Sequence, residues 1–434
     1  SMMKSIVTAL ALASSAGAAA LSEDEASQGD AGGLTPGVSS GATLSEAIGP
    51  GPWASEMIAG AAGAMAAAAS SAPSIEYAPP PYLEPLQVRL QEAATFDKTV
   101  GLAVAIIENG EPVLIHTSGE TAAGSGEPVT AETAFRAASL TKSFTGVLLA
   151  VLEDEGLIDL DAPADPEIIK LKAPRQPTWL ELVTHQTGLP PNAYDNLIEA
   201  GRGADMARAR LAEVDLLCPL GECYTYQNVA FSSVEALVQA STGLSYEEAL
   251  RTYVFEPLGL ETAGVGEDDL TSADSWARPH RGWRRAGDRP GSPRSHYDGL
   301  PSAAGVTLTL NDLIAWAQAH LDEGALEPDV RERVFTPYVR TLRETRGLGP
   351  VRARVRDTHY GLGWRVYEWG DRTLITHAGY LSGYGAQVVM EPETGFAFVA
   401  LWNADARAPW RLWPTVMDLR TGDGPGDWID LIKD

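Results

Sequence analysis

Runs of strand-forming residues lie near both ends of this chain, and helical patterns fill the middle. The apolar run at 101–108 meets a second run, 112–116, through Asn109-Gly110. Asn-Gly between two apolar runs is a strong hairpin signal. Further strands are predicted towards the C-terminus, at 363–368, 373–376, 386–390 and 396–402. Strands at both ends with helices between them predict one antiparallel sheet with a helical lobe inserted into it.

Amphipathic or apolar periodicity predicts the helices around and between these strands. One helix covers 83–96 and another follows Ser139. The others lie at 179–184, 229–241, 311–321 (with Thr309 or Asn311 as its cap) and 409–419. The segment 268–299 is rich in Arg, Pro, Gly and Trp, so we expect a long loop there.

The first 80 residues differ in composition from the rest of the chain. Residues 1–20 combine a lysine, a short apolar run and small residues, a pattern typical of a secretory signal peptide; Ser1-Met2 is interpreted as a cloning remnant. Residues 21–80 are rich in Gly, Ala, Ser and Pro and predict a linker. The G-x-S-x-G at 37–41 has no preceding strand and is discounted. We therefore expect a folded domain at 81–425 in a periplasmic or secreted protein.

Composition excludes several classes of partner. The net charge is −26, so there is no basic surface for nucleic acid. Beyond the signal segment, no apolar run is long enough to span a bilayer. Cys218 and Cys223 are the two cysteines, and export permits a disulfide between them, although two free buried thiols remain the alternative. The oligomeric state stays open.

Ser139 and Lys142 stand three residues apart, and a strongly apolar helical segment, 147–155, follows them. Residues at i and i+3 share one face of a helix, so the hydroxyl and the amine would lie side by side. Burial lowers the proton affinity of an amine, and a neutral amine can activate a serine nucleophile. The alternative is that Ser139 is a helix N-cap and Lys142 an ordinary surface lysine.

A nucleophile of this kind needs a proton route and a donor pair for the oxyanion. Tyr226-Gln-Asn228 precedes a helix and offers a phenol and an amide; Tyr194-Asp-Asn196 is a rival with the same pattern. His377-Ala-Gly379 ends a predicted strand, where Gly379 would let substrate approach the backbone closely. His280-Arg-Gly282 is its rival, but it lies in the predicted loop. Each motif alone also fits packed, non-catalytic residues.

Taken together, Ser139-Leu-Thr-Lys142, Tyr226-Gln-Asn228 and His377-Ala-Gly379 resemble the motifs of the serine β-lactamase and penicillin-binding-protein superfamily. The closest likeness is to class C β-lactamases, family VIII carboxylesterases and D-specific peptidases. This resemblance spans about residues 82–419. It implies an α/β (α+β) fold, with an antiparallel sheet flanked by helices, an all-helical lobe and the active site between them.

The resemblance also implies roles for single residues. Ser139 would be acylated, Lys142 and Tyr226 would share acid and base work, and Asn228 would hold Lys142 and the substrate. The resemblance implies neither a metal nor an organic cofactor. The backbone N–H groups of Ser139 and Tyr380 would form the oxyanion hole, beside Gly379. At the third motif His377 replaces the lysine of K-T-G, and an imidazole is a weaker carboxylate anchor than an ammonium group. The arginines at 278, 281, 284 and 285 would be an alternative source of positive charge or a solvated face.

The sequence therefore predicts a secreted serine hydrolase that forms an acyl-enzyme on Ser139 and hydrolyses small esters or amides, as carboxylesterases and D-peptidases do. The alternative is a class C-like β-lactamase or a penicillin-binding protein acylated by β-lactams. Small-molecule esters, amides or β-lactams are the expected substrates.

Overall fold

The computed structural model describes residues 78–96, 98–282 and 289–433. The predicted signal peptide at 1–20, the motif at 37–41 and all but the last three residues of the predicted linker at 21–80 lie outside the described residues. Arg284 and Arg285 do so as well. Among the described residues, no helix has both the length and the apolar character needed to cross a bilayer.

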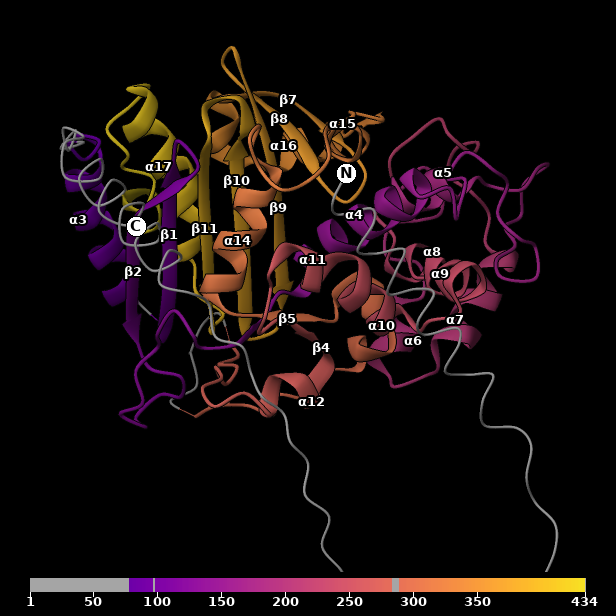
Figure 1. Cartoon of the computed structure of the whole chain (residues 1–434), viewed down its shortest axis with the longest axis horizontal. Helices are drawn as coiled ribbons and strands as arrows, with labels where there is room; N and C mark the ends of the chain where they lie inside the picture. Colours follow the sequence, from indigo (N-terminus) through magenta and orange to yellow (C-terminus); the bar gives the residue numbers. More distant parts are fainter. Residues whose placement is uncertain (1–77, 97, 283–288, 434) are drawn as a thin grey trace, which may run out of the picture. The chain divides into compact units, whose positions relative to one another are not determined.

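An eight-stranded antiparallel sheet forms the larger part of the fold, in the order β2-β1-β11-β10-β9-β8-β7-β6 (Figure 1). Strands β1 (Gly101–Glu108) and β11 (Phe396–Trp402) pair directly, with Leu102 opposite Trp402. The sheet is therefore built from both ends of the chain, as predicted, and β1 and β11 have the predicted bounds. The other strands are β2 (Glu111–Gly119), β6 (Val339–Arg340), β7 (Val355–Tyr360), β8 (Arg365–Trp369), β9 (Arg372–Leu381) and β10 (Tyr384–Glu391).

Helices cover both faces of this sheet because side chains of β1 alternate between two apolar clusters. Leu102, Val104 and Ile106 pack with the terminal helices α3 (Leu83–Thr95) and α17 (Leu412–Thr421). Ala103, Ala105 and Ile107 belong to the cluster on the opposite face, with α14 (Leu310–His320) and α4 (Thr141–Asp154). Successive side chains of a strand point to opposite faces of the sheet, and both faces of this sheet are buried. The strand β1 is therefore almost wholly apolar.

A helical lobe lies beside the sheet, as predicted (Figure 1). It includes α5 (Trp179–Val183), α6 (Asp195–Glu199), α7 (Ala204–Arg210), α8 (Asn228–Phe231), α9 (Val234–Thr242) and α10 (Tyr246–Leu250). A small sheet in the order β3-β5-β4 joins Phe135–Arg136, Val306–Leu308 and Gly264–Val265. Because β3 leads directly to Ser139, this small sheet helps to position the candidate nucleophile.

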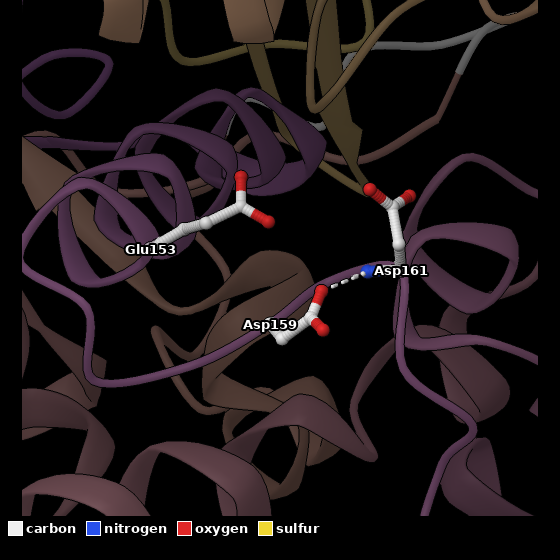
Figure 2. Close-up of side chains that lie close together, drawn as sticks. All are labelled: Glu153, Asp159 and Asp161. Atoms are coloured by element: carbon white, nitrogen blue, oxygen red, sulfur yellow. Dashed lines mark hydrogen bonds between the residues drawn. The ribbon is translucent and has the colours of Figure 1, made fainter.

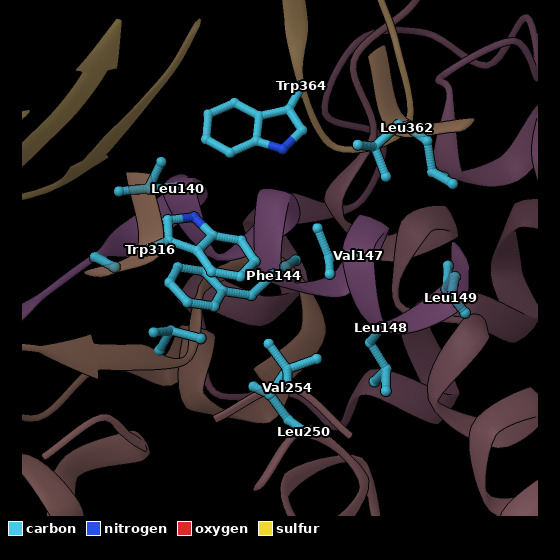
Figure 3. Close-up of a cluster of buried hydrophobic side chains, with 14 of the residues drawn as sticks. Leu140, Phe144, Val147, Leu148, Leu149, Leu250, Val254, Trp316, Leu362 and Trp364 are labelled. Carbon is cyan, nitrogen blue, oxygen red and sulfur yellow. The ribbon is translucent and has the colours of Figure 1, made fainter. Parts of the chain in front are cut away.

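Helix α4 is the centre of the core around the candidate site. All of its residues from Thr141 to Leu152 are buried. Phe144 stacks on Trp316 of α14 with ring centroids 3.9 Å apart, and Figure 3 shows both rings beside Val147 and Trp364. A Cβ at Gly146 would lie 2.1 Å from the carbonyl oxygen of Leu362, so this helix packs backbone to backbone there. Packing this dense leaves Lys142 no access to solvent on the core side.

Two predicted elements differ in the structure, and two strands of the sheet were missed. The helix predicted at 229–241 is two helices, α8 and α9, because the hydroxyls of Ser232 and Ser233 donate back to carbonyl oxygens one turn earlier. The predicted loop at 268–299 begins inside helix α12 (Gly266–Thr271), where the Asp269 carboxylate accepts from the N–H of Val265. Strands β6 and β7 were not predicted.

Cys218 and Cys223 form a disulfide, which settles the alternative left open by the sequence. The bridged loop lies next to the 185–188 turn: Leu217 donates its N–H to the carbonyl oxygen of Gly188. The disulfide therefore restrains the segment that leads to Tyr226.

Candidate active site

Ser139 lies in a short 3₁₀ turn, Ala138–Leu140, between β3 and α4. The residue before it, Ala138, has φ of +50°, a conformation that costs a non-glycine residue free energy. Ser139 is half-buried and lines a cleft. The N-cap position of α4 belongs to Leu140, and no side chain caps it. Ser139 is thus not the N-cap of α4, and its hydroxyl makes no capping hydrogen bond to the helix backbone.

Lys142 lies three residues after Ser139, about one helical turn away, and is fully buried. Its burial excludes the alternative of an ordinary surface lysine. Its Nζ lies 3.3 Å from Oγ of Ser139, 2.7 Å from Oδ1 of Asn228 and 3.0 Å from the carbonyl oxygen of Ala303. Desolvation lowers the pKa of Lys142 to about 7, although the Asp195 carboxylate acts in the opposite direction. A substantial share of this lysine is therefore neutral near pH 7, next to a serine hydroxyl.

Tyr226 lies against the same pair. Nζ of Lys142 lies 4.7 Å from the centroid of its ring. Burial raises the pKa of Tyr226 well above its ordinary value, against the smaller opposing effect of the neighbouring Ser139 side chain. The phenol is therefore neutral near pH 7. The geometry thus favours Lys142 as the base and Tyr226 as a proton donor or relay.

Asn228 connects Lys142 to a chain of hydrogen bonds that the sequence did not reveal. Its Nδ2 donates to Oδ2 of Asp195 at 2.7 Å. The hydroxyl of Tyr297 shares its one proton between the same oxygen, at 3.0 Å, and Oε1 of Glu199, at 2.9 Å. The accepting carboxylate fixes the Asn228 amide so that its oxygen faces Lys142. Asp195 belongs to the rival motif Tyr194-Asp-Asn196, so that motif contributes a positioning carboxylate instead of a second catalytic tyrosine.

We expect Asp195→Asn to lower kcat by about 10- to 100-fold, because the Asn228 amide would no longer be held in one orientation. The same change removes a charge that raises the pKa of Lys142, so the acid limb of the pH–rate profile should move to lower pH. Asp205→Asn is the matched control, since Asp205 is fully exposed on a neighbouring helix. Loss of activity without movement of the acid limb would show that Asp195 only supports folding.

His377 lies inside β9, and not beyond the end of a strand as the sequence predicted, because β9 continues to pair with β10 through Leu381. Both ring nitrogens have partners: Nδ1 is 2.7 Å from the carbonyl oxygen of Ala378, and Nε2 is 3.0 Å from the hydroxyl of Tyr360. Burial, with Arg365 and Lys142 nearby, holds the pKa of His377 well below its usual value. His377 is therefore a neutral residue behind the cleft.

Gly379 packs closely against the turn that carries Ser139, a contact that the sequence did not reveal. A Cβ there would lie 2.0 Å from the carbonyl oxygen of Ala137, so the glycine lets β9 approach the turn that carries Ser139. Beyond Thr376, β9 is no longer paired with β8, and the Ser139 turn lies against this part of the strand. Tyr380, one residue further, lines the cleft together with Ser139.

The cleft has a volume of about 440 Å³ and is open to solvent. Residues from the Ser139 turn, the end of β9, the 293–297 segment and helix α6 line it. Ser139, Asn228 and Tyr380 are thus brought together at one cleft, while Lys142 and Tyr226 lie directly beneath Ser139. The rival His280 is fully buried, 3.1 Å from the N–H of Ala123, and does not line the cleft.

One group of acidic residues outside the cleft has the spacing of a metal site. Glu153, Asp159 and Asp161 lie close together at the end of α4 (Figure 2). However, the guanidinium of Arg333 already bonds Glu153 at 2.7 Å and lies 3.3 Å from Asp161. The cluster is better explained as an ion-pair network that joins α15 (Pro328–Phe335) to α4.

The fold and this cleft define a class of protein. The family model described as Beta-lactamase matches residues 90–419, so the chain belongs to the β-lactamase family and is a serine hydrolase. Among curated relatives, "Penicillin-binding protein 4" of Amycolatopsis lactamdurans is 29% identical over 338 residues, covering 73% of this chain and 84% of the relative. "D-aminopeptidase" of Gluconobacter oxydans is 29% identical, but the match covers 70% of this chain and only 55% of that relative.

Other relatives agree with this assignment. "Beta-lactamase" of Escherichia coli is 29% identical over 277 residues, covering 63% of this chain and 67% of the relative. The octameric penicillin-binding protein homologue from Pyrococcus abyssi superimposes with a TM-score of 0.69 at 22% identity, over 80% of this chain and 78% of the other. At this identity the structural match establishes the fold alone.

Proposed function

We propose that this chain hydrolyses small esters or amides through an acyl-enzyme on Ser139, in the manner of carboxylesterases and D-peptidases. The observation that carries the proposal is the buried Lys142 amine, 3.3 Å from the Ser139 hydroxyl and with a pKa lowered to about 7. A nucleophile beside a base tuned to the working pH is the arrangement that acyl transfer needs.

In the first half-reaction, Oγ of Ser139 attacks the substrate carbonyl carbon while Nζ of Lys142 takes the hydroxyl proton. The carbonyl oxygen becomes an oxyanion, which the backbone N–H groups of Ser139 and Tyr380 would stabilise where β9 meets the Ser139 turn. The tetrahedral intermediate then expels the leaving group. A proton from Lys142, relayed by the hydroxyl of Tyr226, neutralises the departing oxygen or nitrogen.

In the second half-reaction, water replaces the leaving group and the proton transfers run in reverse. Lys142 or Tyr226 accepts a proton as water attacks the acyl carbon, and Ser139 recovers it when its ester bond breaks. Asn228 holds Lys142 through its Oδ1 and, on its cleft side, is placed to contact the substrate. The cycle consumes one water and leaves the enzyme unchanged.

Two observations rank esters and amides above β-lactams. His377 is buried, neutral and bonded through both nitrogens, so it cannot serve as a cationic anchor in the way a lysine would. Among the relatives, three are named D-aminopeptidase. The second candidate, a β-lactamase or penicillin-binding protein, is favoured by the names of three others.

Turnover of three substrates tests this ranking. We expect p-nitrophenyl butyrate or a D-amino-acid p-nitroanilide to be hydrolysed with a higher kcat/KM than a chromogenic cephalosporin. The opposite order would support the β-lactamase alternative. Slow acylation by the cephalosporin without release of product would support a penicillin-binding protein.

We further propose that the protein is exported to the periplasm or secreted. The N-terminal pattern at 1–20 supports this, and so does the Cys218–Cys223 disulfide, because such bridges persist in oxidising compartments. N-terminal sequencing of the protein from a periplasmic or culture fraction should find cleavage near Ala20. An intact N-terminus in a cytoplasmic fraction would contradict export.

A further inference from the structure

A second cation is buried close to Lys142, and it does not line the cleft. Arg365 is the first residue of β8, and only 12% of its side chain is exposed. It is absent from the walls of the cleft that contains Ser139. Burying a charge costs free energy unless partners compensate for it. The groups around Arg365 therefore show what its position achieves.

One carboxylate and one hydroxyl bind the guanidinium of Arg365. Its Nη1 lies 3.3 Å from Oε2 of Glu344, in helix α16 (Leu342–Gly347), and donates to the hydroxyl of Tyr224 at 3.1 Å. The other carboxylate oxygen of Glu344 accepts from the hydroxyl of Tyr367 at 2.9 Å. These partners fix the guanidinium and offset part of its charge.

Three tyrosine rings surround the same guanidinium. Its central carbon, Cζ, lies 5.1 Å from the ring centroid of Tyr360, 5.7 Å from that of Tyr226 and 5.8 Å from that of Tyr224. A cation at this distance is attracted to the electron-rich face of a ring. Nζ of Lys142 lies 4.7 Å from the centroid of the same Tyr226 ring. The two cations are therefore within about 11 Å of each other, separated by protein and not by bulk water.

Two histidines in this region carry no charge near neutral pH. His185 is fully buried, with its ring centroid 4.5 Å from that of Tyr226. Burial, with Lys142 and Arg365 nearby, holds the pKa of His185 and that of His377 well below the usual value. A guanidinium, by contrast, stays protonated at every pH at which the protein is folded. Arg365 is thus a permanent positive charge beside a lysine that titrates.

Lys142 is subject to two opposing charges. After the larger effect of burial, the Asp195 carboxylate raises the pKa of Lys142 and the Arg365 guanidinium lowers it. Like charges repel more strongly in a protein interior than in water, so a fixed cation disfavours a second one nearby. The same guanidinium acts to lower the pKa of Tyr226, against the larger effect of burial.

We propose that Arg365 is a positioning residue for the catalytic base: its buried charge favours the neutral form of Lys142, the form that takes the proton from Ser139. The inference rests on the proposed function and adds to it how the base is kept ready near neutral pH. Arg365 acts through Lys142 and Tyr226, because it does not line the cleft.

A further buried group titrates in the same pH range. Glu235 in α9 accepts from the hydroxyl of Ser302 at 2.7 Å, and burial raises the pKa of Glu235 to about 7. Ser302 precedes Ala303, whose carbonyl oxygen accepts from Lys142. A change in a pH–rate profile could therefore come from either group, so the test has to follow Lys142 itself.

Carbon-13 NMR of lysine labelled at the ε-carbon follows Lys142 directly. The chain has six lysines, and the signal of Lys142 is the one that is missing from Lys142→Met. The shift of an ε-carbon changes when its amine loses a proton. We expect Arg365→Met to move the midpoint of the Lys142 titration up by about one pH unit. The acid limb of kcat/KM should move up by the same amount.

Glu344→Gln should move the Lys142 midpoint in the opposite direction. The amide keeps the size of the carboxylate but removes its charge, so the charge of Arg365 is less offset. We expect the midpoint to fall by about half a pH unit. Arg356→Met is the matched control, since Arg356 lies on the neighbouring strand β7, is 66% exposed and pairs with Glu368. The control should leave the Lys142 titration unchanged.

An unchanged or lower Lys142 midpoint in folded Arg365→Met would overturn the inference. If that variant does not fold, an unchanged or higher midpoint in Glu344→Gln would do so. The NMR titration needs no turnover, so its result is independent of the proposed function. Failure of the proposed function would instead appear as wild-type ester hydrolysis no faster than that of Ser139→Ala.

Discussion

Ser139→Ala should reduce kcat/KM for every ester and amide substrate by about 10⁴- to 10⁶-fold, the range seen when the nucleophile of an acyl-transfer enzyme is removed. Removing Oγ leaves no atom on the cleft side of Lys142 that can attack a carbonyl. The proposed oxyanion donors are backbone N–H groups and would remain, so a small residual rate above the uncatalysed reaction should persist. Initial-rate kinetics with p-nitrophenyl butyrate measure the loss.

The control for this variant is Ser143→Ala, one helical turn further along α4. Ser143 is buried and structural: its hydroxyl donates to the carbonyl oxygen of Leu140 at 2.7 Å and accepts from the indole of Trp316 at 3.2 Å. Its loss should cost about 1 kcal/mol of stability and leave hydrolysis within a few-fold of wild type. Wild-type turnover in Ser139→Ala would end the assignment of Ser139 as nucleophile.

Lys142→Met should lower kcat/KM by about 10²- to 10⁴-fold, the contribution typical of a positioned general base. Methionine has a similar length and suits the buried site. The substitution leaves Oδ1 of Asn228 and the carbonyl oxygen of Ala303 without their partner, so thermal melting should be measured beside the kinetics. Lys170→Met is the control, because Lys170 is exposed. A folded Lys142→Met protein with wild-type rates would contradict the role of Lys142.

The pH dependence of kcat/KM follows from the same residue. Burial lowers the pKa of Lys142 to about 7, and catalysis needs the neutral amine. Activity should therefore rise with pH, reach half its plateau near pH 7, and fall about tenfold per pH unit below that. Because the pKa of Tyr226 is raised, no alkaline loss is expected below pH 10. In Lys142→Met the acid limb with its midpoint near pH 7 should disappear.

Much of the fold could be predicted because its local patterns agree with its tertiary structure. The Asn109-Gly110 pair predicted the turn between β1 and β2. The apolar runs predicted β1 and β11, because both faces of these strands are buried. The amphipathic pattern at 311–321 predicted helix α14, and of its two candidate caps the structure selects Thr309, whose side chain accepts from the N–H of Asp312. Strand β7, with the sequence VRDTHY, carries several polar residues and exposes part of its length. This segment forms a strand because it pairs with β8, and the local sequence pattern does not predict that pairing.

The site was predictable only in part for a similar reason. Ser139, Lys142, Tyr226 and Asn228 form two short motifs, and the structure brings all four together. Asp195 acts through Asn228 from 33 positions away, and its motif resembled a rival tyrosine site. The burial of His377 and the close contact at Gly379 follow from how β9 packs, so their roles could not be read from spacing.

Acid-quenched intact-mass measurement tests the central claim most directly. The enzyme is mixed with excess p-nitrophenyl butyrate, quenched within milliseconds and digested for peptide mapping. We predict a mass increase equal to one butyryl group, located on Ser139 and absent from Ser139→Ala. Turnover with no adduct at any quench time, or an adduct on another residue, would contradict an acyl-enzyme on Ser139.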